Sequence, residues 1–228
     1  MPACYVASAA LISLALWKCG AVEVRGHSGE VLFLSVFGIF WLTLSVNVFP
    51  WLGLSIADDV IERRNPASLI VSIGATLAIA TIYAAGNLGE GPSYWNNIFS
   101  AGLGTIGFFV LWAAVEFGGR VSVSIAEERD IASGLRFCGF IVAAGLILAR
   151  AVAGDWHSEL DTVRDFIHDG WPAAALCVIA IFVERILRPN RARPFPGWPG
   201  YGLLPALAYV GCACAWMVHL GPWEGMPK

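Results

Sequence analysis

The segment Glu62–Ala84 reads ERRNPASLIVSIGATLAIATIYA, and the segment Glu127–Ala149 reads EERDIASGLRFCGFIVAAGLILA. The two segments lie 65 residues apart and align without a gap, with 8 of 23 positions identical. The identical pairs are Glu62/Glu127, Arg64/Arg129, Ala67/Ala132, Ser68/Ser133, Gly74/Gly139, Ala78/Ala143, Ile82/Ile147 and Ala84/Ala149. This pattern predicts an internal repeat, in which each unit is a helix, a charged turn and a second helix rich in small residues.

The apolar part of each copy has the features of a transmembrane helix that packs closely on another helix. Gly74 and Ala78 share one helical face, as do Gly139 and Ala143. A Gly-x-x-x-Ala face lets two helix backbones approach each other within a membrane. Both copies enter the membrane from the same side, so the sequence predicts a parallel repeat about an axis along the membrane normal.

The turns contain residues that typically begin helices. Asn65 is expected to cap the first small-residue helix, with Pro66 at its first position. Asp130 is expected to cap the second, where its carboxylate also suits the positive end of the helix dipole.

The composition indicates that the whole chain is a membrane protein. Of its 228 residues, 57% are hydrophobic and only 14% are charged, whereas a soluble domain carries about 25% charged residues. The net charge of −3 gives no basic surface for a nucleic acid. We therefore expect an all-α, polytopic fold with six to seven transmembrane helices, each needing about 20 apolar residues. The candidate spans are Cys4–Ala21, Val31–Ser55, Ala67–Gly86, Ile98–Phe117, Ile131–Ala153, Trp171–Leu187 and Leu203–Leu220.

Three further expectations concern how these spans are organised. Residues 1–30 form an N-terminal helix and loop, residues 31–155 a four-helix membrane domain with the repeat, and residues 156–228 the C-terminal part. That last part is predicted to begin with an amphipathic helix that lies on the membrane and to continue with two spans. Pro50 is predicted to kink the second span, since it removes a backbone hydrogen bond.

The distribution of basic residues predicts the orientation. The side with the charged turns holds eight basic residues and the opposite side holds five. The first set is Arg63, Arg64, Arg120, Arg129, Arg185, Arg188, Arg191 and Arg193, and the second is Lys18, Arg25, Arg150, Arg164 and Lys228. The positive-inside rule then places the turns and the N-terminus in the cytoplasm.

The paired turns resemble a known family. Glu62–Ser68 with Gly74, and Asp130–Gly134 with Gly139, resemble the two halves of the YjfL-type family, the domain of unknown function 350. The resemblance covers about residues 31–155 and implies a multi-pass protein of the bacterial inner membrane with no assigned chemistry. Family association implies a link to envelope stress and to peptide- or polyamine-ligase systems. Asp130 in place of an asparagine, and Arg136 in place of an apolar residue, depart from the family pattern.

Arg136 is the charge that lies well inside a predicted span, about 9 Å past Asp130 at the helical rise. Three roles are open for it. It can snorkel to the cytoplasmic interface, form a buried ion pair with Glu116 or Glu184, or line a pathway for a solute or ion.

No residue pattern indicates catalysis, a cofactor or a metal. His157, Asp161 and His168 would share one face of the predicted surface helix, but they form no tight zinc motif. The six cysteines lie in predicted spans and are expected to be small buried apolar residues. We predict no metal and no cofactor, and the sequence leaves a bound lipid or pigment open.

Three functions from different classes fit these patterns. The first is a non-enzymatic membrane scaffold or accessory subunit of a larger complex, whose partners are lipids and other integral membrane proteins or a second copy of itself. The second is an oligomeric channel or transporter for a small solute or ion, with Arg136 near the path. The third is a membrane component of envelope stress, which only the family resemblance supports.

Overall fold

The computed structural model describes residues 1–91, 93–156, 158–190 and 197–222, and within them the chain is helical without strands. The long helices are α1 (Pro2–Cys19), α2 (Ser28–Val46), α3 (Pro66–Ala85), α4 (Tyr94–Gly119), α5 (Ile131–Val152), α6 (Glu159–Leu187) and α7 (Leu204–Leu220). Short helical turns lie between them: η1 (Phe49–Leu52), η2 (Ile56–Glu62), η3 (Val123–Glu127) and η4 (Pro199–Leu203). Seven segments of the described chain are long and apolar enough to cross a membrane, which confirms the predicted all-α polytopic fold.

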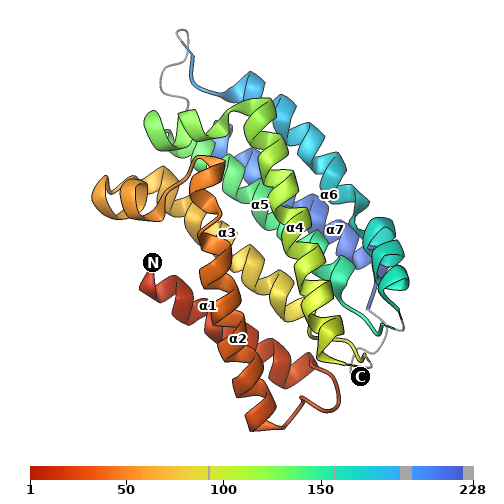
Figure 1. Ribbon diagram of the computed structural model, residues 1–228. Helices are drawn as coiled ribbons and strands as arrows, with labels where there is room; N and C mark the ends of the chain where they lie inside the picture. The colour runs from red at the N-terminus through yellow and green to blue at the C-terminus, as the bar shows by residue number, and fades with distance from the viewer. Residues whose placement is uncertain (92, 157, 191–196, 223–228) are drawn as a thin grey trace.

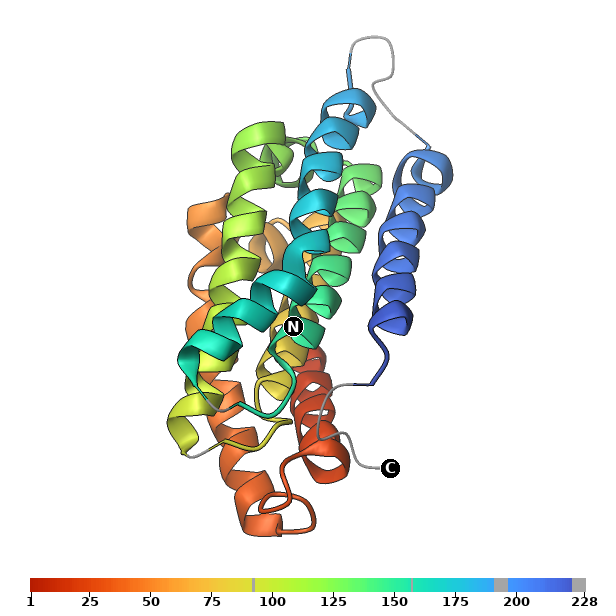
Figure 2. The ribbon, with the colours of Figure 1, turned by 90° about the vertical axis from the view of Figure 1, so that its right-hand side faces the viewer.

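The helices α3 and α5 form the centre of the bundle (Figure 1). Both are buried along most of their length, whereas α1, α6 and α7 expose most of their surface. The helix α3 contacts α1, α2, α4 and α5, and α5 contacts α3, α4, α6 and α7. Figure 2 shows α7 at the edge of the bundle, beside α5. The two copies of the predicted repeat helix are thus the two central helices.

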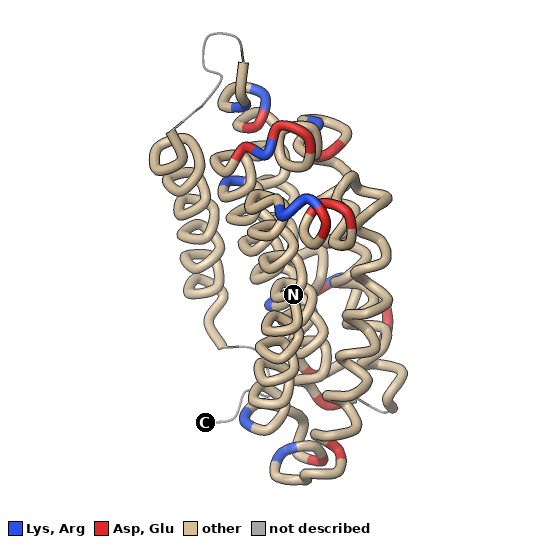
Figure 3. The backbone as a smooth tube through the Cα atoms, turned by 90° about the vertical axis from the view of Figure 1, so that its left-hand side faces the viewer, with Lys and Arg blue, Asp and Glu red and all other residues tan. Residues whose placement is uncertain are grey.

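Charged residues gather mainly at the two ends of the bundle (Figure 3). This placement follows from the cost of a charged side chain at the centre of a bilayer, about 2.5–3.5 kcal/mol on insertion scales. The end with the paired turns is the one that the charge count predicts to be cytoplasmic.

The second helix is shorter than predicted. It ends at Val46 rather than Ser55, and Pro50 lies in the following turn η1. Gly53, with φ of +80°, then redirects the chain into η2. The predicted kink at Pro50 is therefore wrong, because the proline stands near the start of a new turn, where its missing N–H costs nothing.

The sixth helix is longer than predicted. A single helix runs from Glu159 to Leu187 with Pro172 inside it, in place of a surface helix followed by a separate span that begins at Trp171. Figure 2 shows that α6 changes direction along its length, and a proline inside a helix is a common cause of such a bend. The predicted break before Trp171 is therefore wrong, while the expectation that residues 159–170 lie on the membrane surface stays a prediction.

Candidate functional site

The two charged turns end in the same backbone conformation, which residues 63–65 share with residues 128–130 at the offset of 65. Arg64 and Arg129 both adopt the left-handed conformation, with φ of 50° and 56°. In the next residues along the chain, the Asn65 N–H donates to the Asp59 carbonyl and the Asp130 N–H donates to the Ser124 carbonyl, each at 2.9 Å. Short π-helical turns, η2 and η3, precede both. The sequence similarity thus corresponds to one shared local structure.

Asn65 and Asp130 begin α3 and α5 as predicted. The Asn65 side chain accepts hydrogen bonds from the N–H groups of Ala67 and Ser68. The Asp130 side chain accepts from the N–H groups of Ala132 and Ser133 in the same way. These caps satisfy backbone donors that a helix leaves unpaired in its first turn.

The two turns also contact each other. The Asn65 side-chain Nδ2 donates to the Ile125 carbonyl at 2.7 Å, across 60 residues of sequence. The Arg129 guanidinium donates to the Arg63 carbonyl at 2.9 Å. Asn65 is buried, while the other polar repeat residues Glu62, Arg64, Glu127 and Arg129 are exposed. Asn65 therefore joins the two turns from a buried position, whereas Arg129 joins them from an exposed one.

The two cap residues are therefore expected to respond differently to an exchange of amide and carboxylate. Asn65→Asp replaces the Nδ2 donor with an oxygen that faces the Ile125 carbonyl, and we expect it to lower the free energy of unfolding by about 2–3 kcal/mol. Asp130→Asn keeps a side-chain oxygen that accepts the capping hydrogen bonds, so it should lower the free energy of unfolding by no more than about 1 kcal/mol. Detergent-induced unfolding of both variants measures the difference, and equal losses would contradict this role of Asn65.

The predicted small-residue faces pack within this one chain. A Cβ atom added to Gly74 would lie 2.5 Å from the Cys138 sulfur of α5, and one added to Gly145 would lie 2.6 Å from Ala78 of α3. Gly139 lies directly against the backbone of Ala206 in α7. The equivalent glycines of the two copies thus contact different helices, α5 and α7. Ala67, Ala78, Ala132 and Ala143 are all buried in this packing.

Arg136 forms a buried ion pair with Glu184, one of its two predicted partners. Its Nε lies 2.8 Å from Glu184 Oε1 and its Nη2 lies 2.6 Å from Oε2, which is a two-point contact. Arg136 is fully buried and Glu184 is 2% exposed. The alternative of an arginine that snorkels to the interface is therefore wrong, because the carboxylate on α6 neutralises the guanidinium inside the protein.

The ion pair belongs to a longer polar network. Arg136 also donates to Ser133 Oγ at 3.1 Å and to the Tyr201 carbonyl. The Ser133 hydroxyl in turn donates to Asp130 at 2.7 Å. The network connects the cap of α5 with α6 and with η4, which leads into α7. Asp130 and Arg136 are both part of it.

Sequence reasoning missed several members of this arrangement. Glu116, the other predicted partner, accepts hydrogen bonds from the N–H and hydroxyl of Ser122 instead. The Tyr201 carbonyl carried no signal in the sequence, because any residue supplies a carbonyl. Which glutamate pairs with Arg136 depends on helix placement across 48 residues, which no local pattern records.

The described residues contain no group of three or more His, Cys, Asp or Glu side chains that could hold a metal ion. His168 contacts Asp169 at 2.8 Å, and His157 lies outside the described residues. Within the described part of the chain, each charged group of the polar network is paired with another member of the network. These contacts hold α5 against α6 and η4.

Comparison of the chain with known protein families, with curated proteins and with solved structures finds no match. The resemblance to the YjfL-type family accordingly stays a prediction.

Proposed function

We propose that the chain is a non-enzymatic integral membrane protein that serves as a scaffold or accessory subunit of a larger membrane complex. The observation that supports this proposal is the outer face of α7. Small side chains line that face and are exposed: Ala208, Gly211, Cys212 and Ala215. A Cβ atom added to Gly211 would meet nothing within 4 Å.

The spacing of these residues is that of a helix-packing face. They stand at positions i, i+3, i+4 and i+7, so they share one side of α7. Small residues gain no hydrophobic free energy when they move from lipid to a protein contact, but they let a second helix approach closely. On α3 and α5 the same residue types already serve that purpose inside the chain. The occupant we propose for α7 is a transmembrane helix of a different integral membrane protein.

The charge count supports an orientation with the paired turns and the N-terminus in the cytoplasm. The family resemblance supports the bacterial inner membrane as the location, and the shared conformation of the turns supports an origin by duplication.

The channel or transporter alternative has less support, because Arg136 is buried and paired rather than placed beside an open path.

The proposal is tested by extracting the tagged protein in mild detergent and measuring the mass and composition of the intact particle. We expect a stoichiometric complex with at least one other membrane protein. A particle that contains only this chain, as monomer or homo-oligomer, would overturn the proposal.

Two substitutions test whether α7 forms the contact. Ala208→Leu and Gly211→Leu are expected to reduce the amount of co-purified partner by about tenfold, since a bulky side chain separates closely packed helices. Ala174→Leu is the matched control, because Ala174 is also exposed but lies on α6 between the bulky residues Trp171 and Val178. Equal retention of the partner by all three variants would exclude α7 as the docking helix.

A further inference from the structure

The helix α7 packs on α5 in the same register in which α5 packs on α3. Two close glycine contacts of the first pair of helices recur in the second pair. From one pair to the other, the first residue of each contact moves by 65 positions and the second by 68. The contacts of α3 with α5 are Ala67–Gly134 and Gly74–Cys138, and those of α5 with η4 and α7 are Ala132–Gly202 and Gly139–Ala206. The structure thus identifies α7 as a third copy of the repeat helix.

The repeated unit also includes the helix that follows each copy. The N-cap residues of α4 and α6 are Ser93 and Ser158, which are again 65 positions apart. Their hydroxyl groups donate to Asn96 and Asp161 respectively, at 3.3 and 2.7 Å. The helices α2, α4 and α6, which we call the returning helices, run back toward the paired turns and pack on α1, α3 and α5.

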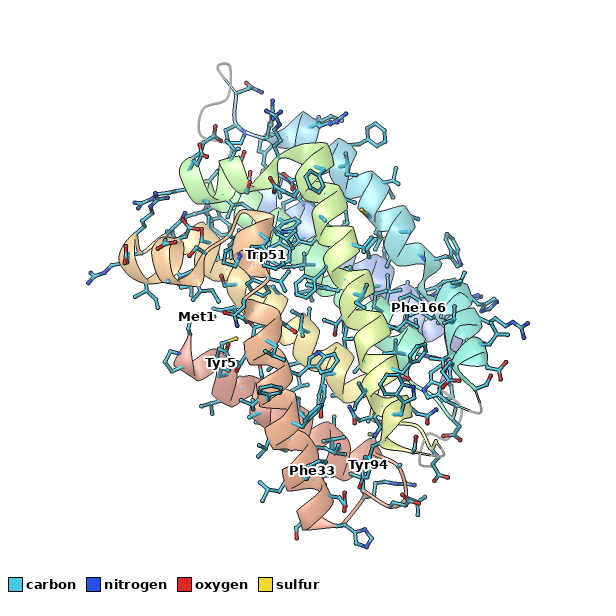
Figure 4. All side chains as sticks on the ribbon, in the orientation of Figure 1. Met1, Tyr5, Phe33, Trp51, Tyr94 and Phe166 are labelled. Carbon is cyan, nitrogen blue, oxygen red and sulfur yellow. The ribbon has the colours of Figure 1, made fainter. Side chains whose placement is uncertain are left out.

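The returning helices also pack side by side. Phe166 of α6, labelled in Figure 4, lies against Gly107 of α4. Within the described part of the chain, α7 is the copy on which no returning helix packs. It touches α6 at only a few residues, and Figure 2 shows it apart from α6.

The face that receives the returning helix is buried in α3 and α5. Ile82 of α3 lies against Gly104 of α4, and Gly86, just after α3, lies against the backbone of Ala101. Ala151 of α5, the equivalent of Gly86, lies beside Gly170 of α6. The residues of this face are Ala75, Ile79 and Ile82 in α3 and Phe140, Ala144 and Ile147 in α5, and each is at most 1% exposed.

The equivalent face of α7 is open. It consists of Ala208, Cys212, Ala215 and His219, which share one side of the helix and are all exposed. Ala208 and Ala215 are smaller than Phe140 and Ile147, their equivalents in α5. A helix that packs here to the density of a protein interior therefore needs bulky side chains of its own.

The other contact of the repeat, with a parallel helix, is blocked on α7. A Cβ atom added to Gly74 or Gly139 would collide with Cys138 of α5 or with Ala206 of α7, so these glycines admit the next parallel helix. Leu207 occupies the equivalent position of α7 and is 59% exposed. Its side chain excludes a parallel helix at that distance. The contact with an antiparallel helix is the one that stays open.

We propose that the partner covers α7 with a transmembrane helix that runs antiparallel to it, in the place that α4 takes on α3 and α6 takes on α5. This inference rests on the proposed function, which assigns the outer face of α7 to another integral membrane protein. The N-terminal end of the partner helix lies at the side opposite the paired turns, which the charge count predicts to be outside the cell. The helix presents leucine, isoleucine or phenylalanine side chains to Ala208 and Ala215.

Photo-cross-linking within the complex purified in mild detergent tests this place and direction. The photoreactive residue p-benzoylphenylalanine replaces Ala208 or Ala215, and mass spectrometry identifies the partner residues that it captures. Leu207 and Cys214 are the matched controls, since each is exposed and adjoins a test position but points about 100° away from it. All four positions are exposed, so the replacements leave the packing of α7 on α5 intact.

We expect at least about fivefold more cross-linked product from positions 208 and 215 than from 207 and 214, because only the first two share the open face. Both products should map to one helix of the partner. The residue captured from position 208 should lie C-terminal to the residue captured from position 215, because the two helices run in opposite directions.

The outcomes separate this inference from the proposed function. Captured residues in the reverse order, products mainly from positions 207 and 214, or no product in a particle that contains a partner would overturn the antiparallel helix and leave the scaffold proposal standing. Capture of a second copy of this chain in such a particle would overturn it as well. A particle that contains only this chain would overturn the proposed function, and this inference with it.

Discussion

Arg136→Leu and Glu184→Leu are each expected to lower the free energy of unfolding by about 3–5 kcal/mol, and the double substitution is expected to recover most of that loss. Each single change leaves one charge buried without its counter-ion. Arg136 is fully buried and Glu184 nearly so, and water does not compensate either charge. The double change removes both charges together and leaves two apolar side chains of similar size.

Unfolding by sodium dodecyl sulfate in mixed micelles, followed by helix content, measures the four stabilities of this cycle. Arg164→Leu is the control, because Arg164 pairs with Asp161 at 3.7 Å while both side chains are about half exposed or more. We expect almost no change there, since solvent screens an exposed pair. If the double variant is no more stable than the single ones, the pair is not the reason for their instability.

Gly139→Leu should separate α7 from α5 and reduce the free energy of unfolding by at least about 3 kcal/mol. Gly139 faces the backbone of Ala206, so neither a rotamer change nor a flexible side-chain end can make room. The helix α7 contacts α5 far more extensively than it contacts α6. The damage should therefore concentrate in α7, where hydrogen exchange of residues 204–220 should rise while that of α3 stays slow.

Two variants make this expectation specific. Gly211→Leu introduces the same side chain on the open side of α7 and should leave stability unchanged. Ala206→Gly should partly restore a Gly139→Ala variant, because it returns space at the same contact. Slow exchange of α7 in the Gly139→Leu variant would show that this contact does not hold the helix.

The parts of the fold that depend on local chemistry could be predicted. Hydropathy identifies seven spans because the bilayer fixes their length. Asn65 and Asp130 could be recognised as caps because capping involves neighbours two and three residues ahead. Conversely, the predicted kink at Pro50 and the predicted start of a span at Trp171 are wrong, because a proline starts a turn, bends a helix or begins one according to the surrounding packing.

The contacts between distant segments could be predicted only in part. The charge of Arg136 showed that a partner was needed, but the choice of Glu184 over Glu116 depends on how α4 and α6 lie beside α5. Two cavities at the opposite end of the bundle could not be predicted from the sequence, since three helices and two loops from distant parts of the chain contribute to their walls. Asn87, which lines one of them, appears as an ordinary polar residue just after a helix until its burial is known.

The helices α1, α3, α5 and α7 form a row in which each helix contacts the next. Gly74 of α3 faces α5 and Gly139 of α5 faces α7, while Gly145 of α5 faces back to α3. A contact between two unlike faces, such as that of α5 with α7, leaves a row open unless the rotation between units completes a ring. The row that runs from α1 through α3 and α5 to α7 therefore has two unlike ends. A lineage that duplicates the unit once more could lengthen the row at α7 without rebuilding its interior.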